Sequence, residues 1–280
     1  PTIDAVKISK TVAIANKETI ICGWEILSKV VKKYKTNILP VDSEHFSILE
    51  LTKGISNAQV EEIIITASGG PFLNTSPNKL KTVKPKQAIK HPNWNMGKKI
   101  SVDSANLMNK VFEVIEAYKF FNFDKSKYKI MIHPQSYVHS IIRFTNGLIK
   151  MILYSTDMKI PISNTIYKNN YLNLSNIKIK NLNNLNFRKV NEKFFPSIKI
   201  LKKITKLGQS APIIINAANE VSVDLFLKGK IGFLDIVTTI NKIFYDKNFK
   251  KYARSKAKSI KEIKTIDNWS RLKTTNMCVR

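Results

Sequence analysis

Segments typical of strands and helices alternate over the first 66 residues, and this alternation constrains the fold more than any other feature. Residues 10–15, 37–41 and 62–66 are short apolar runs that predict strands, and residues 19–35 predict a helix. Strand, helix, strand in that order is typical of a parallel α/β sheet. We therefore expect an α/β fold whose ligands bind beyond the carboxyl ends of the strands.

Polar residues follow each of these three strands, which predicts one shared site at that edge of the sheet. The three groups are Asn16-Lys17-Glu18, Asp42-Ser43-Glu44 and Ser68-Gly69-Gly70. The backbone N–H groups of the last one suit an anion, although a plain tight turn explains the same residues.

Asp42 and Glu44 are candidate metal ligands. They lie two residues apart, so in an extended segment their side chains point the same way. Carboxylates without cysteine or clustered histidine ligands suit a hard cation such as Mg²⁺ or Mn²⁺. An ordinary surface pair remains the alternative, because acidic residues are mostly exposed without any ion.

A second polar cluster surrounds the start of a helix predicted over residues 104–121. Asn109 and Glu113 share a face at i, i+4, and Lys110 lies close to that face. Ser104, Asn109 and Lys110 are donors of the kind a phosphate monoester binds, and helix N-termini attract anions. Glu113 completes a three-carboxylate cluster if its helix abuts the strand ends. A solvated polar face is the alternative.

The rest of the chain predicts a lid, a hairpin and a helical domain. Residues 84–100 form a polar loop with Trp94 and Met96, which suits a lid, unless Trp94 only fills a core edge. Residues 148–154 follow a turn at 145–147 and predict an antiparallel strand pair with the segment before it. The Asn-rich residues 168–193 predict a linker. From residue 194 onward the pattern is helical, with helices expected at 212–227, 232–245 and 255–266.

Composition limits the classes of function and location. The net charge is +27 over 280 residues, but the lysines are spread along the chain and no nucleic-acid-binding motif accompanies them. We expect weak, salt-sensitive binding to polyanions and no specific nucleic-acid function, which stays the disfavoured alternative. Cys22 and Cys278 form no disulfide framework, and no apolar run has transmembrane length. A cytoplasmic protein without a membrane partner is expected.

Eight motifs in a fixed order resemble one enzyme family. They are Asn-Lys-Glu at 16–18, Pro-Val-Asp-Ser-Glu-His at 40–45, Ser-Gly-Gly-Pro-Phe at 68–72, His-Pro-Asn-Trp-Asn-Met-Gly at 91–97, Lys-Ile-Ser-Val-Asp-Ser at 99–104, Met-Asn-Lys at 108–110, Ile-His-Pro-Gln-Ser at 132–136 and Asn-Ala-Ala-Asn-Glu at 216–220. The series is similar to 1-deoxy-D-xylulose 5-phosphate reductoisomerase from about residue 10 to about residue 270.

The resemblance implies an oxidoreductase and isomerase of the non-mevalonate isoprenoid precursor pathway. In the family, a divalent cation, Mg²⁺ or Mn²⁺, chelates the substrate and assists a carbon-skeleton rearrangement. NADPH then reduces the aldehyde to 2-C-methyl-D-erythritol 4-phosphate. The resemblance also implies a homodimer, located in the bacterial cytoplasm or, if a transit segment precedes the chain, in the plastid stroma.

The resemblance assigns residues to roles by motif match. The implied metal ligands are Asp42, Glu44 and Glu113, and the implied catalytic residues add Lys17 and His91. The implied substrate-binding residues are Lys17, Ser43, Glu44, Ser68, His91, Ser104, Asn109, Lys110 and Glu113. Asn16, Glu18 and Gly97 match positions that contact NADPH, while Trp94 and Met96 would close over the substrate.

The implied organisation is an α/β chain in which an α+β catalytic domain follows the end of a Rossmann-like parallel sheet, with a C-terminal all-α helical domain. Residues 1–41 would end the NADPH-binding domain, 42–167 would form the catalytic metal and substrate domain, 168–193 a linker and 194–280 the helical domain.

Three departures from the family pattern accompany this likeness. The nine glycines contain no Gly-x-Gly-x-x-Gly, so we expect a fragment lacking most of the N-terminal NADPH-binding domain. A remnant that binds metal and sugar phosphate without hydride transfer is therefore the alternative function. Phe46 stands where the family has Asn, and Thr156 where it has Pro; Phe46 is expected to crowd the site.

Overall fold

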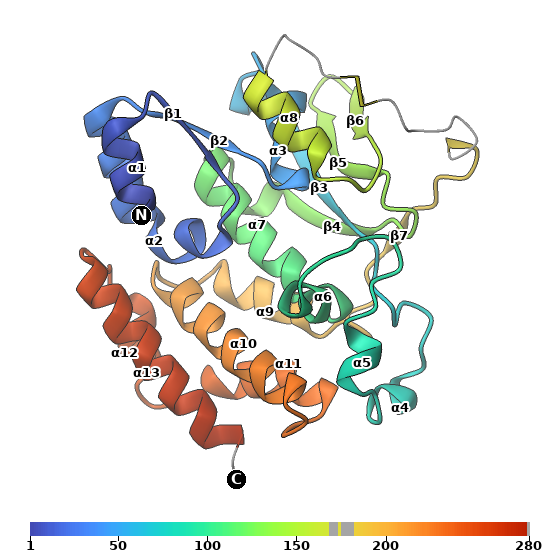
Figure 1. Ribbon diagram of the computed structural model, residues 1–280, viewed down its shortest axis with the longest axis vertical. Coiled ribbons are helices and arrows are strands. Elements are labelled where there is room, and N and C mark those ends of the chain that lie inside the picture. The colour runs from blue at the N-terminus through green and yellow to red at the C-terminus, as the bar shows by residue number, and fades with distance from the viewer. Residues whose placement is uncertain (168–172, 175–181, 279–280) are drawn as a thin grey trace. The chain divides into compact units, whose positions relative to one another are not determined.

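The computed structural model describes residues 1–167, 173–174 and 182–278, which form two compact units (Figure 1). The first unit comprises residues 1–17, 28–68 and 116–190, and the second comprises 18–27, 69–115 and 191–280. Helices α2 (Lys17–Tyr34) and α7 (Met108–Phe121) contain residues of both units. The units reflect packing alone, so the domain boundaries expected from the sequence remain a prediction.

The first unit contains two separate sheets. Strands β1 (Thr11–Ile14) and β2 (Asn37–Pro40), which precede and follow α2 in the chain, pair in parallel, as the sequence predicts. The second sheet has the order β6-β5-β3-β4-β7. Its strands are β3 (Val60–Ala67), β4 (Tyr128–Ile132), β5 (Val138–Phe144), β6 (Ile149–Leu153) and β7 (Arg188–Lys189).

The prediction that the first three strands share one parallel sheet is wrong. Strand β3 pairs in parallel with β4 and antiparallel with β5, so the larger sheet is mixed (Figure 1). The physical reason is that the local pattern of β3, with Ile63 and Ile65 fully buried on one face and Ile64 half-buried on the other, does not specify which strands lie beside it. Alternation along 66 residues says nothing about those distant partners.

The hairpin expected near residue 146 is confirmed, whereas the segment expected to be a linker, residues 168–193, also contains a short strand. Strands β5 and β6 pair antiparallel, and Gly147 at the turn has φ +85°. Strand β7 falls within residues 168–193 and pairs with β4, so this segment is not purely a linker. Residues 168–172 and 175–181 of it lie outside the described part of the chain.

A helix occupies the segment that the sequence predicted to be extended after β2. Asp42 is the N-cap of α3 (Ser43–Thr52), and its carboxylate accepts a hydrogen bond from the Glu44 backbone N–H. The assumption that Asp42 and Glu44 share one side of an extended strand is therefore wrong. Asp is a good N-cap residue, because its side chain satisfies an otherwise unpaired helix N–H.

The single helix predicted over residues 104–121 is in fact two. Helix α6 (Lys98–Ala105) ends at Asn106, and α7 begins at Met108. Leu107 between them has φ +62°, and the Asn106 carboxamide accepts from the Met108 N–H at 2.9 Å. A fully buried Leu in the left-handed region interrupts the helix, and hydrophobic periodicity alone does not reveal such a break.

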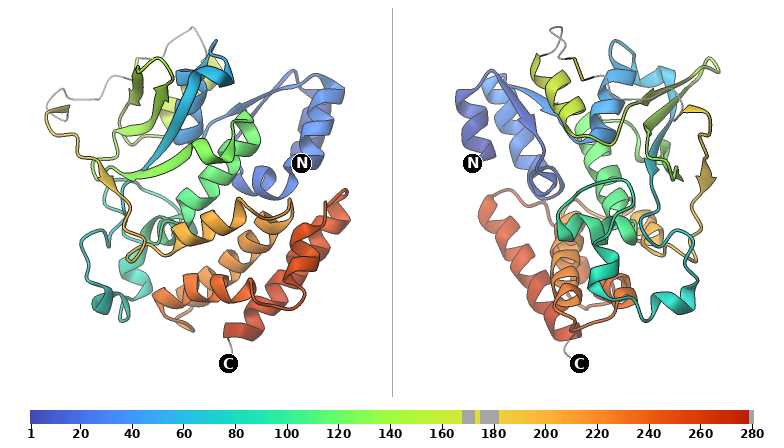
Figure 2. Two further views of the ribbon diagram at one scale, coloured as in Figure 1. Left: turned by 180° about the vertical axis from the view of Figure 1, so that it is seen from behind. Right: turned by 45° about the vertical axis from the view of Figure 1, so that its right-hand side comes forward.

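The second unit is mainly helical, as expected, and α10 (Ala211–Leu227) lies among its other helices (Figure 2). The predicted helix at 232–245 is confirmed as α11 (Phe233–Ile243). The helix predicted at 255–266 is only partly confirmed, because residues 255–259 separate α12 (Phe249–Arg254) from α13 (Ile260–Cys278), which continues well beyond residue 266. The remaining helices are α1 (Thr2–Ile8), α4 (Pro77–Leu80), α5 (Pro85–Ala88), α8 (Lys159–Tyr167) and α9 (Ser197–Ile204).

A buried polar pair fixes α6 to α10. Asn219 Nδ2 donates to Asp103 Oδ1 at 2.8 Å, and Asp103 also pairs with the Lys99 ammonium at 3.1 Å. Because an unpaired carboxylate is costly to bury, these contacts hold the segment that leads into Ser104 in one register. No helix in the described ranges is both long and apolar enough to span a bilayer.

Gly70→Ala is expected to destabilise the second unit more than Gly229→Ala. Both glycines have left-handed φ, at +64° and +71°, which costs about 1–2 kcal/mol for an added side chain. A Cβ at Gly70 would lie 2.7 Å from the Ala105 Cα, whereas one at Gly229 meets nothing within 4 Å. We expect about 1–3 kcal/mol of additional loss at Gly70 from this overlap.

Urea unfolding followed by tryptophan fluorescence tests this comparison, because Trp24, Trp94 and Trp269 all belong to the second unit. Equal midpoints for the two variants would contradict the close backbone contact at Gly70.

Candidate active site

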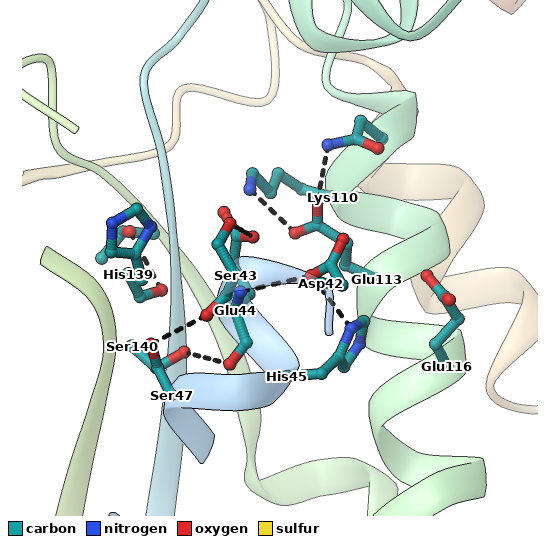
Figure 3. A network of polar contacts seen from close by, with 12 residues as sticks. Asp42, Ser43, Glu44, His45, Ser47, Lys110, Glu113, Glu116, His139 and Ser140 are labelled. Atoms are coloured by element: carbon teal, nitrogen blue, oxygen red, sulfur yellow. Dashed lines mark hydrogen bonds and ion pairs between the residues drawn. The ribbon is translucent and has the colours of Figure 1, made fainter. Parts of the chain in front are cut away.

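The first turn of α3 carries the Asp42-Ser43-Glu44 motif (Figure 3). Ser43 Oγ donates to Glu44 Oε2 at 2.5 Å, and the Glu44 N–H donates to Asp42 Oδ1 at 3.2 Å. Glu44 is buried, with 8% of its surface exposed. The N-cap therefore fixes the conformation of both carboxylates before any ligand is considered.

Four ionisable side chains of the first unit form a network around Asp42. The Lys17 ammonium lies 2.7 Å from Asp42 Oδ2 and 3.3 Å from Glu116 Oε2. His45 Nδ1 lies 3.0 Å from Asp42 Oδ1. His45 and Glu116 are each only 2% exposed, so the network alternates two cations and two anions in a largely water-free setting.

The network shifts the pKa values of its members. Burial opposes a charged imidazole, but Asp42 and then Glu116 outweigh it and raise the pKa of His45 to about 9. Burial likewise opposes the ionised form of Asp42, yet Lys17 and His45 hold its pKa well below the usual range. Burial raises the pKa of Glu116, and Lys17 only partly offsets that effect. At neutral pH, Asp42 is an anion and His45 a cation.

Side chains of the larger sheet hold the backbone of α3 at the site. Ser140 Oγ donates to the Glu44 carbonyl at 3.0 Å, and the Tyr154 hydroxyl donates to the Ser43 carbonyl at 2.8 Å. His139 stacks on the Tyr154 ring at a centroid distance of 3.9 Å. Phe46 packs edge-on against Tyr154, so its ring belongs to this buried support.

The first two turns of α7 carry a second polar group (Figure 3). The Lys110 ammonium lies 2.8 Å from Glu113 Oε2, and Asn109 Nδ2 donates to Glu113 Oε1 at 2.5 Å. All three side chains are buried, and Glu113 is only 1% exposed. The i, i+4 relation of Asn109 and Glu113 that the sequence suggested is therefore a direct hydrogen bond.

Glu113 is the third candidate carboxylate, and it lies on α7. Helix α7 is continuous, so Glu113 lies one turn from Glu116, whose carboxylate contacts Lys17. One oxygen atom from each of Asp42, Glu44 and Glu113 lies within 4.8 Å of the other two. Three buried or half-buried carboxylates at this spacing offer the hard oxygen ligands that Mg²⁺ and Mn²⁺ prefer.

The Ser68-Gly69-Gly70 turn lies against the end of α6. An added Cβ at Gly70 would lie 3.1 Å from the Ser104 carbonyl oxygen, so only glycine permits this approach. Both Gly69 and Gly70 have positive φ, at +83° and +64°. The turn thus brings the segment that follows Ser68 to the part of α6 that carries Ser104.

His91 is a neutral ring in the loop between α5 and α6. Its Nδ1 accepts hydrogen bonds from the backbone N–H groups of Asn93 at 3.1 Å and Trp94 at 2.9 Å. Burial and then the Lys110 charge lower the pKa of His91 to about 4. With Nδ1 accepting, the neutral ring carries its proton on Nε2 and can only donate from there.

The expected cofactor residues lie at the starts of helices. Glu18 is in the first turn of α2, directly after Asn16 and Lys17, and Gly97 is the N-cap of α6, whose carbonyl accepts from Ser101 Oγ at 3.0 Å. Burial disfavours a charged Lys99, but Asp103 and, more weakly, Glu18 and Glu220 raise its pKa.

Sequence reasoning missed Glu116 and Tyr154 as parts of the site, and it did not predict that His45 pairs with Asp42. The only local signal for Glu116 is its i, i+3 spacing from Glu113, and Tyr154 carries none. Two of the four histidines are structural supports: His133 stacks on Phe187 at 4.7 Å, and His139 on Tyr154.

Family models and relatives identify the chain's family. Residues 38–121 match the 1-deoxy-D-xylulose 5-phosphate reductoisomerase C-terminal domain, and residues 153–273 match the DXP reductoisomerase C-terminal domain. A 1-deoxy-D-xylulose 5-phosphate reductoisomerase of Pelagibacter ubique is 49% identical over 281 residues, covering 100% of this chain and 72% of that protein. One of Clostridium botulinum is 46% identical over 84% of this chain and 62% of its own length.

Solved structures agree with these sequence matches. The Zymomonas mobilis enzyme in complex with NADPH superposes with a TM-score of 0.88 at 35% identity, covering 99% of this chain and 71% of that one. A DOX-P reductoisomerase in complex with NADPH, fosmidomycin and magnesium gives a TM-score of 0.93 at 31% identity, with 99% and 72% coverage. The chain belongs to the 1-deoxy-D-xylulose 5-phosphate reductoisomerase family, and it spans 62% to 72% of the length of the two relatives above.

In the metal-free protein, Asp42→Asn is expected to lower the pKa of His45 from its wild-type value of about 9. Removing the nearest anion leaves burial, which disfavours the charged ring, as the larger influence. In the wild type, the pKa of His45 is higher in the folded than in the unfolded protein, so protonation of His45 adds to the free energy of unfolding. This contribution is complete below pH 6.5 and is lost as the pH rises through about 9. The variant should lose this pH dependence.

NMR titration of the histidine ring protons measures both rings in one experiment. His91 is the internal control, because burial and Lys110, not Asp42, set its pKa of about 4. A His45 midpoint unchanged by Asp42→Asn would show that the ion pair does not control its protonation.

Proposed function

We propose that this chain forms the metal- and substrate-binding part of a reductoisomerase that converts 1-deoxy-D-xylulose 5-phosphate to 2-C-methyl-D-erythritol 4-phosphate with NADPH. The observation that carries this proposal is the group of Asp42, Glu44 and Glu113 oxygens within 4.8 Å of one another, beside Lys17. An acidic group this deeply buried is unstable unless cations balance it.

The carboxylate group fits a divalent cation. Its donors are all oxygen atoms, and hydrogen bonds from Ser43, Asn109 and Lys110 orient them. Such outer contacts fix ligand geometry in metal sites. When bound, Mg²⁺ or Mn²⁺ supplies Lewis acidity toward the substrate's ketone and hydroxyl oxygens. The related structure with magnesium and fosmidomycin supports this choice of ion.

The phosphate of the substrate would bind to Ser68, Ser104, Asn109 and Lys110. Lys110 and Asn109 both contact Glu113, but an ammonium has three N–H donors and a carboxamide two, so each could also donate to a phosphate. Ser104 lies at the end of α6. His91 would add a neutral donor through Nε2, since its Nδ1 is used by the loop backbone. Trp94 and Met96 would exclude water from the reacting end.

Lys17 and Ser43 would contact the reacting end of the substrate, where the Lys17 ammonium stabilises developing negative charge on oxygen. Asn16, Glu18 and Gly97 would contact NADPH, as the complexes of two related enzymes with NADPH suggest. These three residues supply only part of a cofactor site, so hydride transfer depends on how much of the NADPH-binding surface accompanies the chain.

Two measurements separate catalysis from binding alone. Calorimetric titration with Mn²⁺ and then with 1-deoxy-D-xylulose 5-phosphate tests the metal and sugar-phosphate sites of the chain. Oxidation of NADPH with formation of 2-C-methyl-D-erythritol 4-phosphate tests the complete reaction. Metal-dependent binding without turnover would favour the binding remnant, and absence of both would refute the proposal.

Glu113→Gln and Lys110→Ala should separate the two halves of the site. Loss of a metal ligand should weaken Mn²⁺ binding by about 100-fold or more while sparing phosphate recognition. Lys110→Ala should weaken sugar-phosphate binding about 10- to 100-fold, the value of one hydrogen bond to a charged group. Calorimetry measures both affinities for both variants.

The wild type and Lys129→Ala, an alteration in β4 outside the proposed site, serve as controls. Equal losses of both affinities in both variants would show that the Lys110–Glu113 pair works as one unit.

We also propose that the chain forms a homodimer through the edge strand β6. Leu148 and Ile149 expose 56% and 59% of their surfaces, and Met151 exposes 41%. An apolar edge strand is an unsatisfied pairing surface, and a second copy is the partner that the family resemblance suggests.

Ile149→Lys is expected to shift the protein from dimer to monomer in sedimentation velocity, because a charge on the apolar edge opposes its burial. Lys150→Ala, at the neighbouring position of β6, is the matched control and should remain dimeric. A dimer that persists in Ile149→Lys would exclude this edge as the interface.

A further inference from the structure

Glu116 is a buried carboxylate that the proposed reaction leaves without a role. It is 2% exposed and lies on α7, one turn beyond Glu113. Its Oε2 lies 3.3 Å from the Lys17 ammonium. Because burying a carboxylate is costly, a position that serves only packing would be better filled by a neutral side chain.

The two oxygens of Asp42 have different partners. Oδ1 accepts from the Glu44 N–H at 3.2 Å and lies 3.0 Å from His45 Nδ1, which together occupy its two lone-pair directions. Oδ2 lies 2.7 Å from the Lys17 ammonium. A divalent cation bound to Asp42 therefore has to approach Oδ2, the oxygen that Lys17 holds.

Lys17 takes up one of the two lone-pair directions of Oδ2, so a divalent cation that binds this oxygen does so beside the ammonium. Two cations on one carboxylate oxygen repel each other, and the repulsion is poorly screened because the surroundings are buried. The ammonium needs another anion within reach if it is to leave Oδ2 and stay charged. Glu116 Oε2 is already within ion-pair distance of the same nitrogen atom.

We propose that Glu116 is a positioning residue that takes up the Lys17 ammonium when a divalent cation binds Asp42. This inference rests on the proposed function, because it assumes that Asp42 is a metal ligand. Glu116 frees Oδ2 for the cation and keeps Lys17 charged beside the site. His45 complements it by holding Oδ1, so the Asp42 carboxylate does not rotate during the exchange.

Calorimetric titration with Mn²⁺ of wild type, Glu116→Gln, Lys17→Met and the double variant tests the exchange. Gln keeps the size of the side chain and removes its charge. Glu116→Gln should weaken Mn²⁺ binding about 10-fold, the effect typical of residues behind the metal ligands. In the Lys17→Met background the same change should alter the affinity less than about threefold, since the competing ammonium is gone.

Glu116→Asp keeps the charge and provides a second variant if Glu116→Gln folds poorly. It should retain most of the wild-type affinity, and Glu62→Gln, in strand β3 of the same unit, is a carboxylate control without expected effect. Circular dichroism verifies that each variant is folded.

The outcomes distinguish this inference from the proposed function. A wild type that binds no Mn²⁺ would overturn both. A wild type that binds Mn²⁺ while Glu116→Gln has no effect would overturn the inference alone. If Glu116→Gln weakened Mn²⁺ binding about 10-fold both with Lys17 present and in the Lys17→Met background, the inference would also be overturned, because Glu116 would then act without Lys17.

Discussion

The N-cap of α3 is the contact on which the rest of the site depends. Asp42 follows β2 by one residue, caps the start of α3 and pairs with Lys17 and His45 through its two oxygens. One side chain therefore couples local helix formation to a buried ion network. Such a network is stable only when every charge has a partner, so α2, α3 and α7 are constrained together through Lys17, Asp42 and Glu116. The raised pKa of His45 and the lowered pKa of Asp42 are two expressions of the same balance.

The break between α6 and α7 is the second constraint. A continuous helix would carry Ser104 and Lys110 on a fixed helical spacing, whereas the left-handed Leu107 gives α7 its own start. That start places Asn109 and Lys110 in a first turn, with Glu113 hydrogen-bonded to both. The Asp103–Asn219 pair holds α6, which carries Ser104, in one register against α10. Asn109, Lys110 and Glu113 therefore form one hydrogen-bonded group at the start of α7.

Several parts of the fold were accessible from the sequence, because they depend on short-range physics. Helix α10 with the left-handed Gly229 after it, the β5–β6 hairpin around Gly147 and the parallel β1–β2 pair all follow from local periodicity and turn residues. The eight motifs also indicated the family correctly. The mixed sheet was not accessible, because β3 pairs with strands more than 60 residues away in the chain. Treating Asp42-Ser43-Glu44 as extended was an error of local reasoning, since Asp is a good N-cap residue.

The sequence by itself determined which chemical groups are available and the family to which their order belongs. The groups are three carboxylates of the kind that suits a hard cation, and hydroxyl, amide and ammonium donors of the kind that suits a phosphate. Tertiary structure alone decided which of these groups contact one another. Lys17 and Glu116 are 99 residues apart, and Tyr154 supports Ser43 across 111 residues. Burial then sets their protonation, making His45 a cation and His91 a neutral donor although both are histidines. The physical reason is that desolvation and charge pairing depend on neighbours in space, and a linear pattern encodes only neighbours along the chain.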